Sequence, residues 1–392
     1  MDIGKGYIIR APQYFDPVAT ATFTGAFTGT PNNGDYPVDI VKTGVNDLNC
    51  IGNPYPSAIN AKKFIEGNPG AFGLVNPGTT LYFWTHNTAI TGNNYTFDDY
   101  ATYNFTGGVG TGASSAGLNN ASPNGMIAAG QSFMVQGVIE GTTTATFTNA
   151  MREIGNNTQF FRLQNDEIEK SRVWLALKNN EGVYKQILVG YIENATDGFD
   201  NGFDGETLEA GNSASFYSIL DTKKLAIQGR GNNFNETDQI QLGFKSTLVG
   251  NFEIDLSDFD GLFENQTVYL EDTMLHIIHN LNENPYSFTT EAGTFDARFV
   301  LRFTNVSLGI SELDFNSNAV IVYKNAAQKI VINSRVKEMK SIRIFDTLGR
   351  LIWHSENVNS KEQIIAEIPS GTTMLISMQL IDNLTIINKF SN

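Results

Sequence analysis

The chain has 392 residues, of which 41% are hydrophobic and 11% aromatic, a length typical of two or three domains with packed cores. Only 17% of the residues are charged, and Gly, Asn, Phe and Tyr are frequent, which favours β-sheets joined by tight turns and excludes a coiled coil, a disordered tail or a helical bundle. The formal net charge of −15 excludes a nucleic-acid partner, because phosphate binding needs clustered Lys and Arg.

Charge is distributed unevenly along the chain. The net charge is −4 over residues 1–160, −14 over 161–315 and +3 over 316–392. A weakly basic tail behind a strongly acidic block indicates a separate module. Polar and glycine residues interrupt the apolar pattern between Leu308 and Asn318, where the joint is expected. We therefore predict three domains, at residues 1–160, 161–311 and 312–392.

Short strands separated by turns are predicted throughout the first block. Residues 81–85 (Leu-Tyr-Phe-Trp-Thr) and 131–135 (Gln-Ser-Phe-Met-Val) are apolar runs of strand length between clusters of Pro, Asn and Gly. One short helix is also expected, because Ser57 is a suitable N-cap, apolar residues around Phe64 share one face, and Gly67 ends the pattern.

The second and third blocks are denser in strand-like runs. The expected strands of the acidic block are 173–177, 186–192, 225–228, 251–256, 268–270 and 298–303. Those of the tail are 320–323, 330–332, 341–345, 351–353, 364–368 and 374–380. Strands do not alternate with helices, so a parallel sheet is not expected. The predicted fold class is all-β: tandem antiparallel β-sandwiches of the jelly-roll or Ig-like kind with one short helix, plus a small C-terminal Greek-key sandwich.

The sequence gives little support for catalysis. It contains no Gly-x-Ser-x-Gly nucleophile elbow and no phosphate-binding loop with a Lys-Ser/Thr pair. Its single cysteine, Cys50, excludes a disulfide within the chain. No run of about 18 apolar residues is present, so no transmembrane segment is expected. We predict that the protein is not an enzyme.

Several carboxylates cluster in a glycine-rich loop at residues 197–206. The acidic residues of this loop are Asp197, Asp200, Asp204 and Glu206. The glycines let the backbone curl so that several oxygens converge, which suits a hard cation such as calcium, although the spacing differs from that of an EF-hand. We predict a calcium site here and no other cofactor. The alternative is a solvated acidic turn above packed Phe199 and Phe203.

Residues 341–353, Ser-Ile-Arg-Ile-Phe-Asp-Thr-Leu-Gly-Arg-Leu-Ile-Trp, resemble the central hairpin of the C-terminal sorting domains of the type IX secretion system of Bacteroidetes. In that family a strand, an Asp-x-x-Gly-Arg turn and a second strand follow an opening strand and precede a closing pair. The resemblance covers the tail. A loop held by two strands presents its side chains rigidly. We therefore expect the turn of Asp346, Gly349 and Arg350 to be the export signal.

The tail departs from the commonest subtype of that family. Tyr323-Lys324-Asn325-Ala326 stands where that subtype has Tyr-Pro-Asn-Pro, and Gly371-Thr372-Thr373 where it has Gly-x-Tyr. The chain therefore resembles a divergent subtype, similar to the sorting signal called type C.

Segments of the first block resemble the regions that precede such sorting domains in flavobacterial surface proteins. Among them are residues 4–8 (Gly-Lys-Gly-Tyr-Ile), 51–57 and 128–133. The resemblance implies a secreted protein at the outer-membrane surface, with the type IX translocon and its outer-membrane shuttle barrel as partners. In that family Gly-Lys-Gly-Tyr lies inside a long precursor, so we expect the first domain to be N-terminally truncated.

Two functions fit these observations. The first is a non-catalytic C-terminal part of an adhesin-like surface protein, whose tail directs export and surface attachment and whose ligand is a polysaccharide or another surface protein. The alternative is an accessory carbohydrate-binding region of a secreted polysaccharide hydrolase, with the catalytic domain outside this chain. Exposed rings in a row would favour the sugar binder, and buried rings the adhesin. The rings in question are Trp84, Tyr95, Tyr100 and Tyr103.

Overall fold

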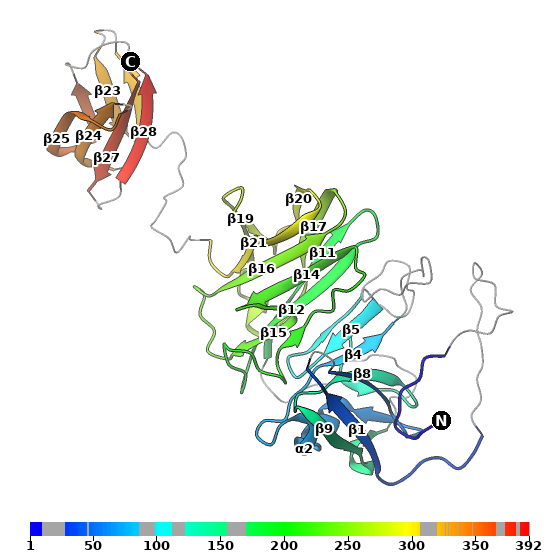
Figure 1. Cartoon of the computed structure of the whole chain (residues 1–392). Helices are drawn as coiled ribbons and strands as arrows, with labels where there is room; N and C mark the ends of the chain where they lie inside the picture. The colour runs from blue at the N-terminus through cyan, green and yellow to red at the C-terminus, as the bar shows by residue number, and fades with distance from the viewer. Residues whose placement is uncertain are drawn as a thin grey trace. The chain divides into compact units, whose positions relative to one another are not determined.

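The computed structural model describes residues 1–9, 28–44, 47–85, 99–111, 122–154, 170–305, 320–325, 327, 329–335, 337–346, 348–365, 373–381 and 385–391. They belong to two compact units, residues 1–305 and 306–392, and each is treated by itself (Figure 1). The predicted domain boundaries after residues 160 and 311 lie outside the described residues.

The first unit begins with a part that we call the N-terminal lobe, up to residue 154. It contains one five-stranded sheet, in the order β2 (Leu48–Gly52), β8 (Ser132–Gln136), β4 (Leu81–Trp84), β5 (Tyr100–Tyr103) and β6 (Gly108–Val109). A three-stranded sheet and a strand pair complete it: β10 (Arg152–Glu153), β3 (Ala58–Asn60) and β7 (Met126–Ile127), and β1 (Tyr36–Lys42) with β9 (Gly141–Phe147). The helices are α1 (Ala61–Glu66), α2 (Pro69–Phe72) and the 3-10 helix η2 (Asn149–Met151).

Helix α1 is the short helix that the sequence predicts, but Ser57 is not its cap. Asn60 is the N-cap, because its side chain accepts a hydrogen bond from the backbone N–H of Lys63 (3.1 Å). Ser57 instead precedes strand β3, and its hydroxyl accepts a hydrogen bond from Arg152 Nε (2.9 Å). Gly67 ends the helix as predicted.

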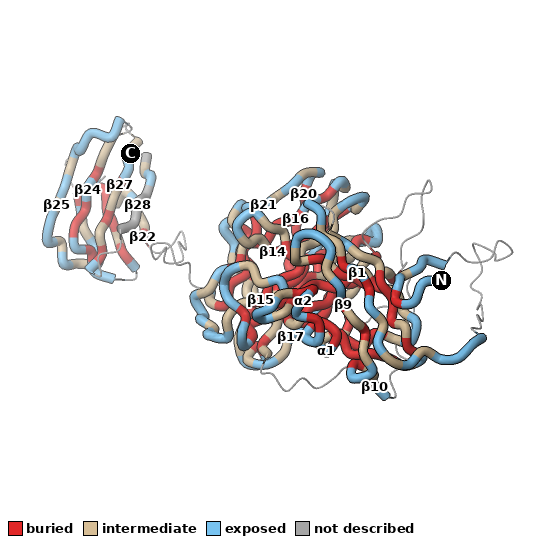
Figure 2. Tube along the Cα trace, turned by 60° about the horizontal axis from the view of Figure 1, so that its bottom comes forward, coloured by how far each residue is buried: buried red, intermediate tan, exposed pale blue. Residues whose placement is uncertain are grey.

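A second short helix, α2, follows directly, so the prediction of one helix is too low. It starts at Pro69, where the missing N–H of proline costs nothing in the first turn. Helix α1 buries Phe64, whose ring stacks on Phe147 of β9 at 4.7 Å between centroids. The helices therefore cover the core of the N-terminal lobe (Figure 2).

Residues 170–302 form the second part of this unit, which we call the large-sheet lobe. Its strands follow the order β19 (Ile277–Asn280), β18 (Tyr269–Asp272), β21 (Gly293–Arg302), β16 (Gln239–Ser246), β14 (Ala214–Leu220), β15 (Lys223–Gly231), β12 (Tyr184–Ile192), β11 (Lys170–Asn179), β17 (Gly250–Asp260) and β20 (Tyr286–Thr290). The short strand β13 (Gly205–Glu206) pairs with β15, and a 3-10 helix, η3 (Gly261–Glu264), follows β17.

The large sheet curls over itself so that strands far apart in its order share one core. Phe244 of β16 and Phe288 of β20 lie 5.4 Å apart between ring centroids, although five strands separate β16 from β20 in the sheet. Both rings belong to one buried cluster. Burying such a cluster is the main stabilising term for a sheet of this size.

A buried polar network closes the same fold. Asp272 at the end of β18 is fully buried and pairs with Arg298 of β21 (2.8 Å). The Tyr286 hydroxyl of β20 donates to the same carboxylate (2.9 Å), and the backbone N–H groups of Met274 and Leu275 donate to its other oxygen. The network thus links β18 and β21 to the strand at the opposite end of the sheet order.

The second unit is a small two-sheet sandwich. One sheet has the order β22 (Val320–Lys324), β23 (Ile330–Ser334) and β26 (Glu362–Ile365), and the other β25 (Leu351–Ser360), β24 (Met339–Asp346), β27 (Thr373–Leu380) and β28 (Thr385–Ser391). Alternate residues point inward, so that Ile342, Ile344, Ile376 and Met378 are buried together with Ile332 from the other sheet.

The predicted all-β class with antiparallel sandwiches is confirmed. Among the described strand pairs the exception is β12 with β15, which run parallel. The connection between these two strands contains β13 and β14, so a parallel neighbour arises without a strand–helix–strand unit. No described helix is long and apolar enough to cross a membrane.

Replacing the buried carboxylate of Asp272 tests the closure of the large sheet. Asp272→Ala leaves Arg298 buried without its counter-charge, and we expect the free energy of unfolding to fall by about 3–5 kcal/mol. Urea unfolding measures this. The control is Asp2→Ala, which removes an exposed ion pair with Lys5 and should leave the free energy of unfolding nearly unchanged. Equal losses in the two variants would contradict the role given to Asp272.

Candidate functional site

The predicted calcium loop lies where the two lobes of the first unit meet, and we call residues 196–206 the junction loop. Its backbone is tied to the N-terminal lobe: Phe105 N–H donates to Gly202 O (2.9 Å), and the Thr80 hydroxyl donates to Asp204 O (3.0 Å). Strands β5 and β6 lie beside β15 and β12 at the same junction (Figure 1). The loop therefore joins two lobes through its main chain.

Asp204 holds the junction loop in its curled shape. Its side chain is 1% exposed, and its two oxygens accept hydrogen bonds from the backbone N–H groups of Asp200 (2.7 Å) and Gly229 (2.9 Å). Burial raises the pKa of Asp204 to about 7, although the two backbone hydrogen bonds act in the opposite direction. This carboxylate therefore has a structural partner for each oxygen.

The other three carboxylates of the loop also have partners other than one another. Asp200 accepts hydrogen bonds from the N–H and hydroxyl of Thr196. Asp197 lies 3.5 Å from an Arg230 nitrogen, and Glu206 pairs with Lys223. Over the described part of the chain, no three His, Cys, Asp or Glu side chains are grouped to hold a metal ion. Each of the four carboxylates is thus hydrogen-bonded or paired with another group of the protein.

Two glycines let the junction loop touch the N-terminal lobe closely. A Cβ atom on Gly78 would lie 2.4 Å from the Cα atom of Gly202, which is closer than real Cβ contacts come. Gly78 precedes strand β4, whose neighbour in the sheet is β5. Backbone packs on backbone here, so neither position has space for a side chain.

A cavity of about 610 Å³ lies along one side of the junction loop, and we call it the junction cavity. Helix α1, the loop at residues 73–77 and the end of β5 line it from the N-terminal lobe. The end of β12 and residues 199–203 line it from the large-sheet lobe. The cavity falls in the range of small-molecule sites, which often form between lobes.

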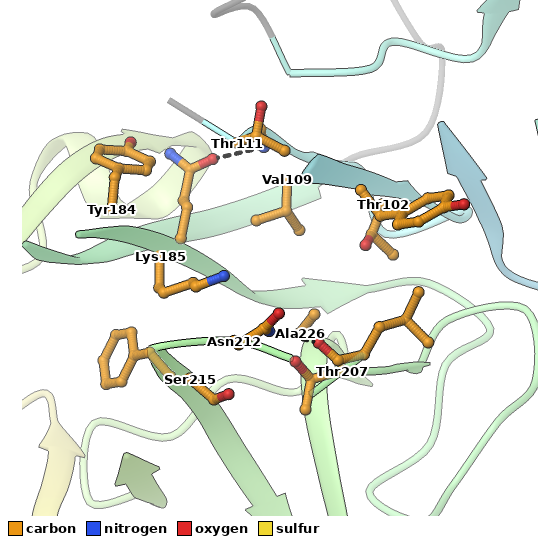
Figure 3. A pocket seen from close by; sticks show the side chains of 14 residues that line it. Thr102, Val109, Thr111, Tyr184, Lys185, Thr207, Asn212, Ser215 and Ala226 are labelled. Atoms are coloured by element: carbon orange, nitrogen blue, oxygen red, sulfur yellow. Dashed lines mark hydrogen bonds between the residues drawn. The ribbon is translucent and has the colours of Figure 1, made fainter. Parts of the chain in front are cut away.

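A second, smaller pocket of about 50 Å³ surrounds Lys185 of β12 (Figure 3). Lys185 extends into it between Asn212 and Val109, and the neighbouring Gln186 accepts a hydrogen bond from Gly110 N–H (2.9 Å). Burial lowers the pKa of Lys185 to about 7, because the ammonium ion loses hydration. The amine is therefore partly neutral at physiological pH.

No sequence pattern predicts the junction cavity or the Lys185 pocket. Lys185 is one basic residue beside the apolar run that forms β12, and nothing in that run marks it as facing a pocket. The junction cavity is lined by segments more than a hundred residues apart in sequence. The alternative to a calcium site places Phe199 and Phe203 beneath the acidic loop. Both rings are half-buried in the structure.

The described residues of the predicted export-signal turn, in the second unit, are Asp346 and 348–350. Asp346 Oδ1 accepts hydrogen bonds from the N–H groups of Leu348 and Arg350 (both 2.9 Å), and its Oδ2 pairs with Arg350 Nε (2.6 Å). Gly349 has a φ of 79°, which a glycine adopts without strain. Hydrogen bonds from Arg350 and Leu348 hold the pKa of Asp346 below its usual value. The Arg350 side chain projects outward and is 76% exposed.

The aromatic residues proposed as a sugar platform do not form an exposed row among those that the structure describes. Tyr103 is buried, and Trp84 and Tyr100 are half-buried. Tyr100 lines the Lys185 pocket, whereas Tyr103 lines the junction cavity. Tyr95 lies outside the described residues.

Comparison with known protein families finds two matches. The family described as a domain of unknown function, DUF8693, matches residues 1–303. A second family, also described as a domain of unknown function, DUF8694, matches residues 308–390. No curated protein matches the sequence. The division between the two matches falls at the division between the two compact units.

The glycine contact at the junction yields a matched pair of variants. Gly78→Ala forces the new methyl group against the anchored loop, and we expect it to lower the free energy of unfolding by about 1–3 kcal/mol. Gly70→Ala, in α2, meets no atom within 4 Å and should leave the stability unchanged or raise it by less than about 1 kcal/mol. Urea unfolding of both variants measures the difference, and equal stabilities would show that the lobes do not need this contact.

The buried Asp204 carboxyl predicts a pH dependence. Its pKa in the folded state, about 7, lies above its unfolded value, so the folded state binds the proton more tightly. The free energy of unfolding should therefore fall as the pH rises from about 4 to about 7 and level off above. Asp204→Asn does not titrate, so subtracting its pH profile from that of the unaltered protein isolates this effect. Parallel profiles would contradict the shifted pKa.

Calcium binding by the loop stays a prediction. Thermal melting with calcium and with a chelator tests this. A melting temperature that rises with calcium in the unaltered protein but not in Asp200→Ala would support the site. Identical melting curves with calcium and with the chelator would contradict it.

Proposed function

The chain belongs to the family described as a domain of unknown function, DUF8693, and we propose that it is a non-catalytic part of a secreted, adhesin-like cell-surface protein. The C-terminal unit directs export through the type IX secretion system and attachment at the outer-membrane surface. Its partners are the translocon and the outer-membrane shuttle barrel. The proposal assigns no reaction to the chain.

The observation that carries this proposal is the turn at Asp346. Three hydrogen bonds to its carboxylate, together with the pairing of β24 and β25, hold the two ends of the turn together. The Leu348 and Arg350 side chains project into solvent. A receptor therefore meets a rigid apolar and basic pair, and little conformational entropy is lost on binding.

The separateness of the C-terminal unit supports the same proposal. It has its own hydrophobic cluster, contacts within itself define it as one compact unit, and its own family covers residues 308–390. A unit with its own core folds without its cargo. An export signal must act when it is attached to different cargo proteins. A module that folds by itself meets this requirement.

The charge of the tail fits this role as well. Residues 316–392 carry a net charge of +3, whereas residues 161–315 carry −14. Arg343 and Arg350 are both more than half exposed. Exposed cations attract an acidic receptor surface and raise the association rate.

The second candidate is an accessory carbohydrate-binding region of a secreted hydrolase. The junction cavity, which Tyr103 helps to line, favours it.

A reporter fusion tests the export role. Residues 312–392 fused to a periplasmic reporter should carry it to the surface or the medium of a type IX-competent host. Arg350→Ala removes an exposed side chain at the turn and should reduce export at least about tenfold, the effect of losing about 1.4 kcal/mol of binding. The matched control is Arg343→Ala, which removes a second exposed arginine, 57% against 76% exposed, from the same hairpin.

Two outcomes would contradict the proposal. One is a reporter that stays periplasmic while a known sorting domain exports it in the same host. The other is equal export by the two arginine variants, which would remove the turn from recognition. Circular dichroism of each purified variant shows that the sandwich is still folded.

A further inference from the structure

We propose that the junction cavity binds a neutral saccharide. The cavity, about 610 Å³ in volume, opens between the two lobes of the first unit. This volume lies within the range of about 300–1,000 Å³ that small-molecule sites span. The inference concerns residues 1–305 alone and does not depend on the export role of the tail.

Aromatic rings supply the apolar part of the lining. Phe199 and Phe203 of the junction loop are half-buried, and Tyr103 and Phe105 come from the N-terminal lobe. Phe105 and Phe203 meet edge to face at 5.9 Å, so one ring from each lobe forms a continuous apolar wall. The C–H faces of a pyranose ring are apolar and pack on such rings.

Three asparagines supply the polar part. Asn76, Asn194 and Asn201 lie in three separate segments that line the cavity, and each amide both donates and accepts hydrogen bonds. Sugar hydroxyls do the same. Asn76 and Asn194 have φ angles of 52° and 72°, the left-handed conformation that asparagine adopts more readily than most residues.

The charges of the lining exclude other classes of ligand. Glu66, Glu193 and Asp200 line the cavity together with Lys62 and Lys170, so the acidic residues of the lining outnumber the basic ones. A phosphate-bearing ligand needs the opposite balance. A fatty acyl chain would leave these charges and amides without water, which is unfavourable. A neutral ligand with apolar faces and hydroxyl edges suits both parts of the lining.

The walls of the cavity are already in place. Asp204 fixes the junction loop through two backbone N–H groups, and Thr196 fixes Asp200. Gly202 packs against Gly78 on the opposite lobe. Binding therefore does not have to order the loop, and that removes a cost which weakens flexible sites.

Calorimetric titration of the full chain tests the proposal. The probes are four disaccharides: cellobiose, maltose, lactose and N,N′-diacetylchitobiose. We expect at least one of them to bind with a Kd near or below the millimolar range. Asn201→Ala changes an exposed side chain and should weaken that binding about tenfold, as should Phe199→Ala. The control is Thr111→Ala in the Lys185 pocket, which should leave the Kd unchanged.

Melting curves show whether each variant is folded, and Asn201→Ala keeps the test valid if Phe199→Ala is unstable. Failure of all four disaccharides to bind would overturn the proposal. Binding that Asn201→Ala leaves unchanged would also overturn it, because the sugar would then lie elsewhere. Neither result bears on export, which the reporter fusion measures separately.

Discussion

The buried carboxylate of Asp204 fixes the loop through which the two lobes of the first unit meet. Its oxygens accept hydrogen bonds from Asp200 within the loop and from Gly229 on β15. The loop then packs Gly202 against Gly78, and Gly202 O accepts a hydrogen bond from Phe105 N–H. It also places two phenylalanine rings in the wall of the junction cavity. Desolvation of Asp204 is the cost of this arrangement, and the shifted pKa records that cost. An acidic loop whose carboxylates suggest a metal site thus acts as the connector of two lobes.

The two compact units are held together by different contacts. In the first, contacts between strands far apart in the sheet, such as Phe244 with Phe288 and Asp272 with Tyr286, close one continuous core. In the second, a sandwich presents a turn in which the Asp346 carboxylate accepts hydrogen bonds from the backbone N–H groups of Leu348 and Arg350. We propose that the first holds a ligand between its lobes and that the second is recognised while joined to other cargo. The boundary between the matched families separates the same two parts.

Sequence alone predicted the elements with local causes. The strands at 81–85, 186–192 and 341–345 follow from apolar runs bounded by turn residues, and the Asp346 turn follows from Asp and Gly at fixed spacing. The predicted cap of α1 is wrong because Ser57 and Asn60 are both good N-cap residues. Strand β3 begins after Ser57 and ends at Asn60, so the helix can start only after Asn60. The partners of Asp200 and Glu206, the parallel β12–β15 pair and both cavities depend on contacts distant in sequence, which no local pattern encodes.

Hydrogen exchange along a urea series tests most directly whether the junction loop makes one cooperative unit of the two lobes. The slowest amides of β4 and β8 in the N-terminal lobe, and of β12 and β16 in the large-sheet lobe, should share one opening free energy and one urea dependence. Those of β24 and β27 in the C-terminal unit should open with a different free energy, because that unit has its own core. If β4 and β8 instead open at a clearly lower free energy than β12 and β16, the lobes unfold separately. The junction loop would then not be the constraint that holds them together.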